Sequence, residues 1–153
     1  LILIIIILVI KMEENKNALD EVNKGCTMGI EAINTLMDEN NNKDFKKLLE
    51  KELKEYDKIE DKIQRLYGKY SEKTPHEVGI ISKTMTDYMT NMKLMKDHTD
   101  SRIAEIWLQG TNMGIIEGKK ILNNKKLDKE VSELIEEFVN HQEKIVEEIK
   151  KYL

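Results

Sequence analysis

The sequence predicts an all-α protein, a four-helix bundle made of two duplicated helical hairpins with a long connecting helix. The chain has 153 residues, of which 35% are charged, 40% are hydrophobic and 1 is a proline. This length and composition fit one domain built of helices. Gly25-Cys26-Thr27-Met28-Gly29-Ile30 returns in similar form as Gly110-Thr111-Asn112-Met113-Gly114-Ile115, 85 positions later. Each copy leads into a long amphipathic stretch, so one hairpin repeats the other and an up-and-down bundle can form.

Residues 1–10 are all Leu, Ile or Val, unlike the rest of the chain. The run is too short to span a bilayer, which takes about 20 residues, and it lacks the flanks of a signal peptide. One interpretation is that Met12 is the true start and residues 1–11 are an apolar N-terminal extension upstream of it. The other is a real anchor or partner-binding segment, because such a run is otherwise an aggregation hazard. We expect membrane contact only if residues 1–10 are part of the protein. Residues 12–153 are expected to form a single helical bundle domain.

The first two helices are predicted over residues 17–39 and 43–71. In each, apolar or small residues recur at spacings of three and four. The triplet Asn40-Asn41-Asn42 separates them and can cap the second helix. Only Glu52 interrupts the apolar stripe of the second helix.

A third helix is predicted over residues 75–98. Thr74-Pro75-His76-Glu77 is a strong helix start, with Thr74 as cap and Glu77 placed to reach back to the cap amide. Cap-forming residues near 99–101 predict a break after it. The apolar register runs on through this break, so one kinked helix over residues 75–122 is the alternative. The third helix is therefore expected either to cross between the hairpins or to continue into the fourth.

The fourth and fifth helices are predicted over residues 101–122 and 128–152, with a polar loop between them. The fifth carries one apolar stripe that includes Phe138, Gln142 and Ile145. The pairs Gly25/Gly29 and Gly110/Gly114 each sit four residues apart and remove side chains from one helix face. They predict close packing of the equivalent helices, with a ligand approaching bare backbone as the alternative.

Charge and cysteine content narrow the partners and the compartment. A net charge of −4 with mixed Lys and Glu gives no basic face for phosphates, so we expect no nucleic acid partner. The lone Cys26 cannot form an internal disulfide or a thiolate zinc pair. We therefore expect a cytoplasmic protein.

Two hairpins with a long connection resemble the ferritin-like fold, and the stretch from Gln109 to Glu117 is similar to small uncharacterised bacterial ferritin-like bundle proteins. In metal-binding members, one Glu comes from the first helix of each hairpin and a Glu-x-x-His from the second. The resemblance therefore implies a di-iron or manganese site, although Ile116 stands at one ligand position and neither second helix has a Glu-x-x-His. The candidate ligands are Glu31, Glu52, Glu55, Glu117, Glu137 and His141.

No Walker loop, nucleophile elbow, zinc-protease motif or Rossmann fingerprint is present in the sequence. We therefore expect a non-enzymatic bundle that acts as a structural or protein-interaction module, self-associates or binds a protein partner, and needs no cofactor. The alternative is a ferritin-like metal-binding stress protein that uses iron or manganese. The surroundings of Glu52 distinguish these two functions, because a buried carboxylate must be paired, protonated or metal-bound. A hydrogen bond from a tyrosine or His141, or a lysine salt bridge, would satisfy it without metal.

Overall fold

The structure is a computed structural model that describes residues 1–75 and 82–153. These residues form helices and connecting loops and contain no strand, so the all-α class is confirmed. The elements are α1 (Ile2–Asp38), α2 (Lys43–Tyr67), α3 (Lys83–Lys93), α4 (Asp100–Asn124), α5 (Lys129–Ile149) and the short 3-10 helix η1 (Lys150–Tyr152).

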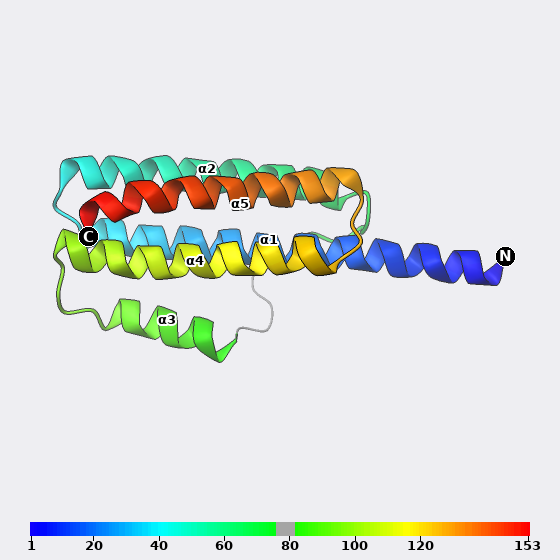
Figure 1. Ribbon diagram of the computed structural model, residues 1–153, viewed down its shortest axis with the longest axis horizontal. Coiled ribbons are helices and arrows are strands. Elements are labelled where there is room, and N and C mark those ends of the chain that lie inside the picture. The colour runs from blue at the N-terminus through cyan, green and yellow to red at the C-terminus, as the bar shows by residue number, and fades with distance from the viewer. Residues whose placement is uncertain (76–81) are drawn as a thin grey trace.

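The four long helices α1, α2, α4 and α5 lie side by side (Figure 1). Helix α1 packs most extensively on α2, and α4 on α5, so each pair is an antiparallel hairpin. After α2 the chain returns to the opposite end of the molecule before α4 begins, and α3 lies on the outside along this return (Figure 1). The core between the helices is built of aliphatic and aromatic side chains such as Leu19, Leu49, Ile103 and Ile135.

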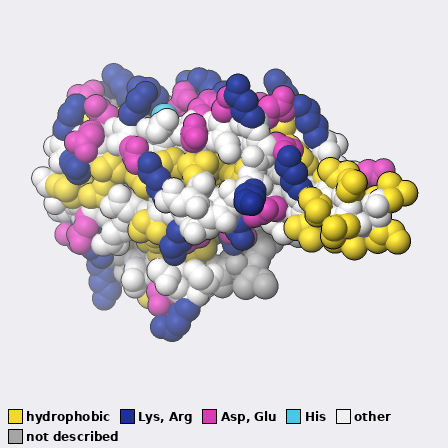
Figure 2. All heavy atoms as spheres, turned by 45° about the vertical axis from the view of Figure 1, so that its right-hand side comes forward, with side chains coloured by type: hydrophobic (Ala, Val, Ile, Leu, Met, Phe, Trp, Pro, Cys, Tyr) yellow, Lys and Arg dark blue, Asp and Glu magenta, His cyan; other side chains and the backbone are white. Residues whose placement is uncertain are grey.

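Helix α1 begins at Ile2, which corrects the prediction that the first helix spans residues 17–39. Residues 2–16 contain no Gly or Pro to stop a helix, so the apolar run continues into the bundle helix without interruption. Its first turns project beyond the other helices, and apolar side chains cover the projecting part (Figures 1 and 2). Among the described residues, no helix combines the length and apolarity needed to cross a membrane.

The predicted break at the Asn triplet is confirmed. The Asn42 side chain caps α2 by accepting hydrogen bonds from the backbone N–H groups of Asp44 and Phe45. The amides of Asn40 and Asn42 also donate to the two carboxylate oxygens of Asp100, at 3.2 and 2.6 Å. This loop therefore fastens the first hairpin to the start of α4. Helix α2 ends at Tyr67 and not at residue 71. Residues 68–70 continue as turns, with Gly68 still in the right-handed helical region (φ −57°, ψ −19°).

The prediction for the third helix is wrong in extent. Thr74 and Pro75 are not helical, and His76 and Glu77 lie outside the described residues. The helix that the structure describes begins at Lys83 and is capped by Ser82, whose hydroxyl accepts from the Met85 N–H. It ends at Lys93, and residues 94–99 are not helical.

The single kinked helix over residues 75–122 is also excluded. Thr99 caps α4 by accepting from the Arg102 N–H, so the break predicted near residues 99–101 is confirmed and reaches back to residue 94. Helices α4 and α5 agree with their predictions within three residues at each end.

Candidate functional site

Glu52 lies in the middle of α2 with 1% of its surface exposed. Both carboxylate oxygens bond to side chains of α5. His141 Nε2 lies 2.6 Å from Oε2 of Glu52, and Gln142 Nε2 donates to Oε1 at 2.9 Å. The charge that interrupts the apolar stripe of α2 is therefore satisfied within the bundle. The prediction that a hydrogen bond from His141 could satisfy Glu52 is confirmed.

The network continues to Tyr56, one helical turn after Glu52. The Tyr56 hydroxyl donates to Oε1 of Gln142 at 2.9 Å. Burial is the largest cause that raises the pKa of Tyr56 well above its usual value, so the phenol stays protonated and donates. Gln142 thus accepts from Tyr56 and donates to Glu52, and the chain of bonds runs from His141 at the surface to Tyr56 in the interior.

His141 is the member of this network that reaches solvent, with 25% of its side chain exposed. The hydrogen bond with Glu52 raises the pKa of His141 above its ordinary value of 6.5, and partial burial opposes that rise. The charged form of the imidazole is therefore favoured beside Glu52. Sequence reasoning missed Gln142 as a partner, although a polar residue in the apolar stripe of α5 is the same signal that singled out Glu52.

None of the other predicted metal ligands is hydrogen-bonded to Glu52 or His141, although Glu55 and Glu137 line the same shallow surface pocket as His141. Each pairs with a lysine at the surface: Glu31 with Lys93 (3.8 Å), Glu55 with Lys58 (2.8 Å), Glu117 with Lys120 (3.7 Å) and Glu137 with Lys62 (2.5 Å). Glu31, Glu117 and Glu137 are about half exposed, at 55, 59 and 49% of their side chains. Within residues 1–75 and 82–153, no three His, Cys, Asp or Glu side chains are grouped to hold a metal ion.

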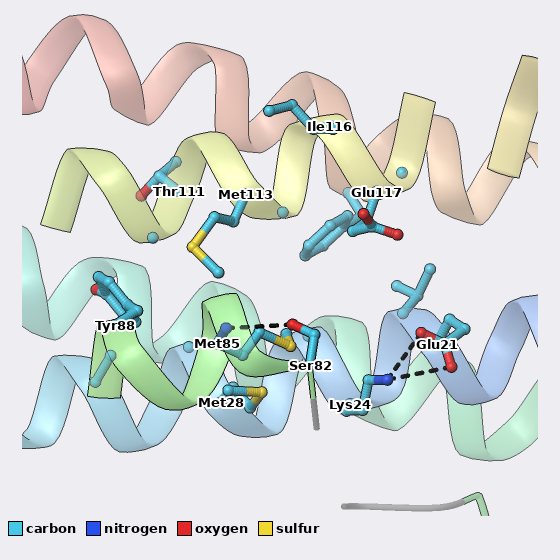
Figure 3. A pocket seen from close by; sticks show the side chains of 18 of the residues that line it. Glu21, Lys24, Met28, Ser82, Met85, Tyr88, Thr111, Met113, Ile116 and Glu117 are labelled. Atoms are coloured by element: carbon cyan, nitrogen blue, oxygen red, sulfur yellow. Dashed lines mark hydrogen bonds and ion pairs between the residues drawn. The ribbon is translucent and has the colours of Figure 1, made fainter. Parts of the chain in front are cut away.

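A cavity of about 490 Å³ lies between α1, α3 and α4. The glycines singled out by the repeat line it from both sides, Gly25 and Gly29 on α1 and Gly110 and Gly114 on α4. Figure 3 shows Met113 of α4 opposite Met28 and Met85, and all three line the cavity. Tyr56 and Phe138 also reach its wall from α2 and α5, so one end of the polar network borders this space.

Two tyrosines explain why glycine is required at two of these positions. A Cβ at Gly29 would lie 2.5 Å from Cζ of Tyr56, and a Cβ at Gly110 would lie 2.4 Å from the hydroxyl oxygen of Tyr88. At Gly25 and Gly114 the nearest atom would be Cζ of Phe138, at the ordinary distances of 3.9 and 3.5 Å. The first two glycines therefore allow close tyrosine packing, and the other two leave open space.

Two features thus stand out chemically. The network of Glu52, Tyr56, His141 and Gln142 is hydrogen-bonded throughout and can hold or release a proton at His141. The cavity is apolar and large enough for a small molecule. The chain matches no protein-family model, no curated protein and no solved structure.

Proposed function

We propose that this protein is a non-enzymatic helical-bundle module for protein interaction, which self-associates through residues 1–10, at the start of α1. One observation carries this proposal. The side chains of residues 1–10, all apolar, are between 48 and 91% exposed, and they project from the bundle as a separate patch (Figure 2). A contiguous apolar surface of this kind is a feature of interaction sites.

The pattern of the segment favours a second copy of the chain as partner. A helix that is apolar on every side is stable when it is buried on every side. In a pair, each helix covers one face of the other, whereas three or more helices around an axis cover more of each surface. Ile at both core positions of a heptad also favours three or four strands, and Ile4 and Ile7 have the spacing of such a pair. We therefore expect a trimer or a larger assembly.

Light scattering after size-exclusion chromatography tests the proposal on the full chain over a range of concentrations. The unmodified protein should elute as a trimer or larger. A variant with Ile4→Glu, Ile7→Glu and Leu8→Glu should elute as a monomer, because the assembly would bury several charges. The matched control replaces two apolar residues that are exposed elsewhere, Leu94→Glu and Leu153→Glu, and should keep the assembly.

A monomeric unmodified chain would overturn self-association. In that case, the unmodified chain is sedimented with phosphatidylcholine vesicles. Binding to the vesicles that is lost in the triple variant would show that the same segment binds lipid.

The finer fold and compartment belong to the same proposal. We propose a ferritin-like arrangement of two duplicated hairpins, supported by the two antiparallel pairs and the long return that carries α3 (Figure 1). The matched glycines on α1 and α4, which line one cavity, support the duplication. The buried lone Cys26 is in keeping with a reducing compartment, so the cytoplasm is the proposed location.

A metal-binding stress protein with iron or manganese is the second candidate function. What supports it is the contact between Glu52 and His141, two predicted ligands from facing helices. The surface pairing of Glu31, Glu117 and Glu137 weighs against it. The metal content of the purified protein separates the two candidates.

A further inference from the structure

The cavity between α1, α3 and α4 has the size and lining of a small-molecule site. Its volume of about 490 Å³ falls in the range of ligand pockets, roughly 300 to 1,000 Å³. Three methionines and four aromatic residues line it, and Gly25 and Gly114 leave open space beside Phe138. Thioether side chains adapt to the shape of an apolar guest. The lining therefore suits a hydrophobic molecule.

The charged groups at the cavity are already paired, so an ionic ligand would find no open counter-charge. Lys24 pairs with Glu21 at 3.0 Å, at one end of the space shown in Figure 3. Glu117 pairs with Lys120. The Thr111 hydroxyl donates to the carbonyl of Trp107 at 2.9 Å. Because burying an unpaired charge is costly, the ligand should be uncharged.

One polar group at the other end of the cavity is available to a ligand. Tyr88 from α3 lies there, opposite Glu21 and Lys24 (Figure 3), with its hydroxyl against Gly110 of α4. Among the described residues, none is hydrogen-bonded to this hydroxyl. Burial raises the pKa of Tyr88 well above its usual value. A protonated phenol in this position donates a hydrogen bond to an oxygen acceptor.

We propose that this cavity binds an uncharged hydrophobic small molecule that carries an oxygen acceptor, with the Tyr88 hydroxyl as donor. The body of the ligand lies beside Gly25 of α1 and Gly114 of α4, where the space is open. Its acceptor oxygen points toward the Tyr88 hydroxyl, which lies against Gly110. This site is separate from the apolar segment of residues 1–10 and does not depend on self-association.

Prodan, an uncharged naphthalene with one ketone oxygen, is a suitable probe because its emission responds to an apolar environment. Trp107 is the single tryptophan of the chain, and it lines the cavity. Energy transfer from Trp107 to prodan therefore detects prodan that is bound near the cavity. The full chain is titrated with prodan, and binding is followed by Trp107-sensitised emission. We expect saturable binding to the unmodified protein.

Gly25→Leu tests the location of the probe. A Cβ at Gly25 meets only Cζ of Phe138, at the ordinary distance of 3.9 Å, and Gly25 lines the cavity, so a leucine there would place its side chain in the ligand volume. We expect binding to weaken about tenfold or more, because the side chain occupies ligand volume. Gly68→Leu is the matched control, since Gly68 lies at the end of α2, away from the cavity. It should bind prodan as the unmodified chain does.

Tyr88→Phe tests the hydrogen bond, since it keeps the ring and removes the donor. Prodan binding should weaken about three- to tenfold, the net effect of one hydrogen bond. The triple glutamate variant of residues 4, 7 and 8 should keep full binding even where it no longer self-associates, which separates this proposal from the proposed function.

Two outcomes would overturn the proposal. One is equal binding by the Gly25→Leu and Gly68→Leu proteins, both with intact helical circular dichroism. The other is binding that disappears only in the triple glutamate variant, which would place the probe on the apolar segment.

Discussion

His141 Nε2 lies 2.6 Å from Oε2 of Glu52, so a side chain that reaches solvent contacts a carboxylate that is 1% exposed. Gln142 bonds to the other oxygen of the same carboxylate. Two neighbouring residues of α5 thus hold both oxygens of the buried charge on α2. The contact links the packing of the two hairpins to the protonation of His141.

We predict that the free energy of unfolding falls as pH rises above about neutrality. The hydrogen bond with Glu52 raises the pKa of His141 in the folded protein above its ordinary value of 6.5. The stabilisation from the charged imidazole is fully present below pH 6.5 and is lost as pH rises through the raised pKa. Urea unfolding at a series of pH values measures it.

His141→Gln should remove this pH dependence. His98→Gln is the matched control, because His98 pairs with Glu39 at the surface, at 2.5 Å, and does not contact Glu52. A pH dependence that survives in the His141→Gln protein would contradict the assignment.

Replacement of Glu52 should be one of the more costly single changes in the bundle. Glu52→Ala removes the partner of both His141 and Gln142, and breaking a buried pair costs about 3 kcal/mol because the remaining polar groups stay desolvated. Glu55→Ala is the control, since Glu55 pairs with Lys58 near the surface and should cost about 1 kcal/mol or less. Equal losses of unfolding free energy in the two variants would show that the buried network contributes little.

The helical class and several helix boundaries could be predicted from the sequence, because local side-chain patterns determine them. The apolar spacing of three and four marks the faces that meet in the core. Asn42 and Thr99 mark helix starts because their side chains satisfy backbone N–H groups there. Glu52 was singled out for its place in an apolar stripe, and its contact with His141 follows from the packing of α2 on α5.

Other features depend on contacts that helical spacing does not encode. The cap signal at Thr74 predicts a third helix that begins at residue 75, whereas the described helix begins after Ser82. Glu31, Glu117 and Glu137 lie on helices that form the bundle, but successive residues differ by about 100° around a helix, and these three side chains face lysines at the surface. The role of Tyr88 against Gly110 could not be predicted, because it depends on where the short α3 packs.

Metal content distinguishes the interaction module from the metal-binding alternative. We expect protein purified without chelator, and then incubated with iron or manganese, to hold less than one equivalent of metal. The physical reason is that, among the predicted ligands, only Glu52 and His141 are hydrogen-bonded to each other, and a stable site needs more ligands than these two. Elemental analysis after desalting is the measurement.

The double variant Glu52→Ala, His141→Ala is the control for that experiment. Stoichiometric iron or manganese in the unmodified protein that this variant loses would favour the ferritin-like metal protein and would require the surface carboxylates to move inward. The same low metal content in both proteins would leave the interaction module as the better proposal.

The same substitution at two glycines of α1 should change stability in opposite directions. Gly29→Ala places a Cβ 2.5 Å from Cζ of Tyr56, and the ring cannot move easily because it is 6% exposed and its hydroxyl is bonded to Gln142. Such overpacking costs about 1 to 3 kcal/mol. Gly25→Ala places a Cβ at an ordinary 3.9 Å from Phe138, so the gain in helix propensity remains, up to about 1 kcal/mol.

Urea unfolding of the two alanine variants measures both effects against the same parent protein. A lower free energy of unfolding for Gly29→Ala together with a higher one for Gly25→Ala would show that Tyr56 packs directly on the backbone of α1, while the space beside Gly25 is open. A rise in both would mean that Tyr56 shifts freely, and the hydrogen bond from Tyr56 to Gln142 would then contribute little to the bundle. A lower free energy of unfolding in both variants would mean that a neighbouring side chain already fills the space beside Gly25. The leucine of Gly25→Leu would then clash with that side chain instead of occupying the ligand volume.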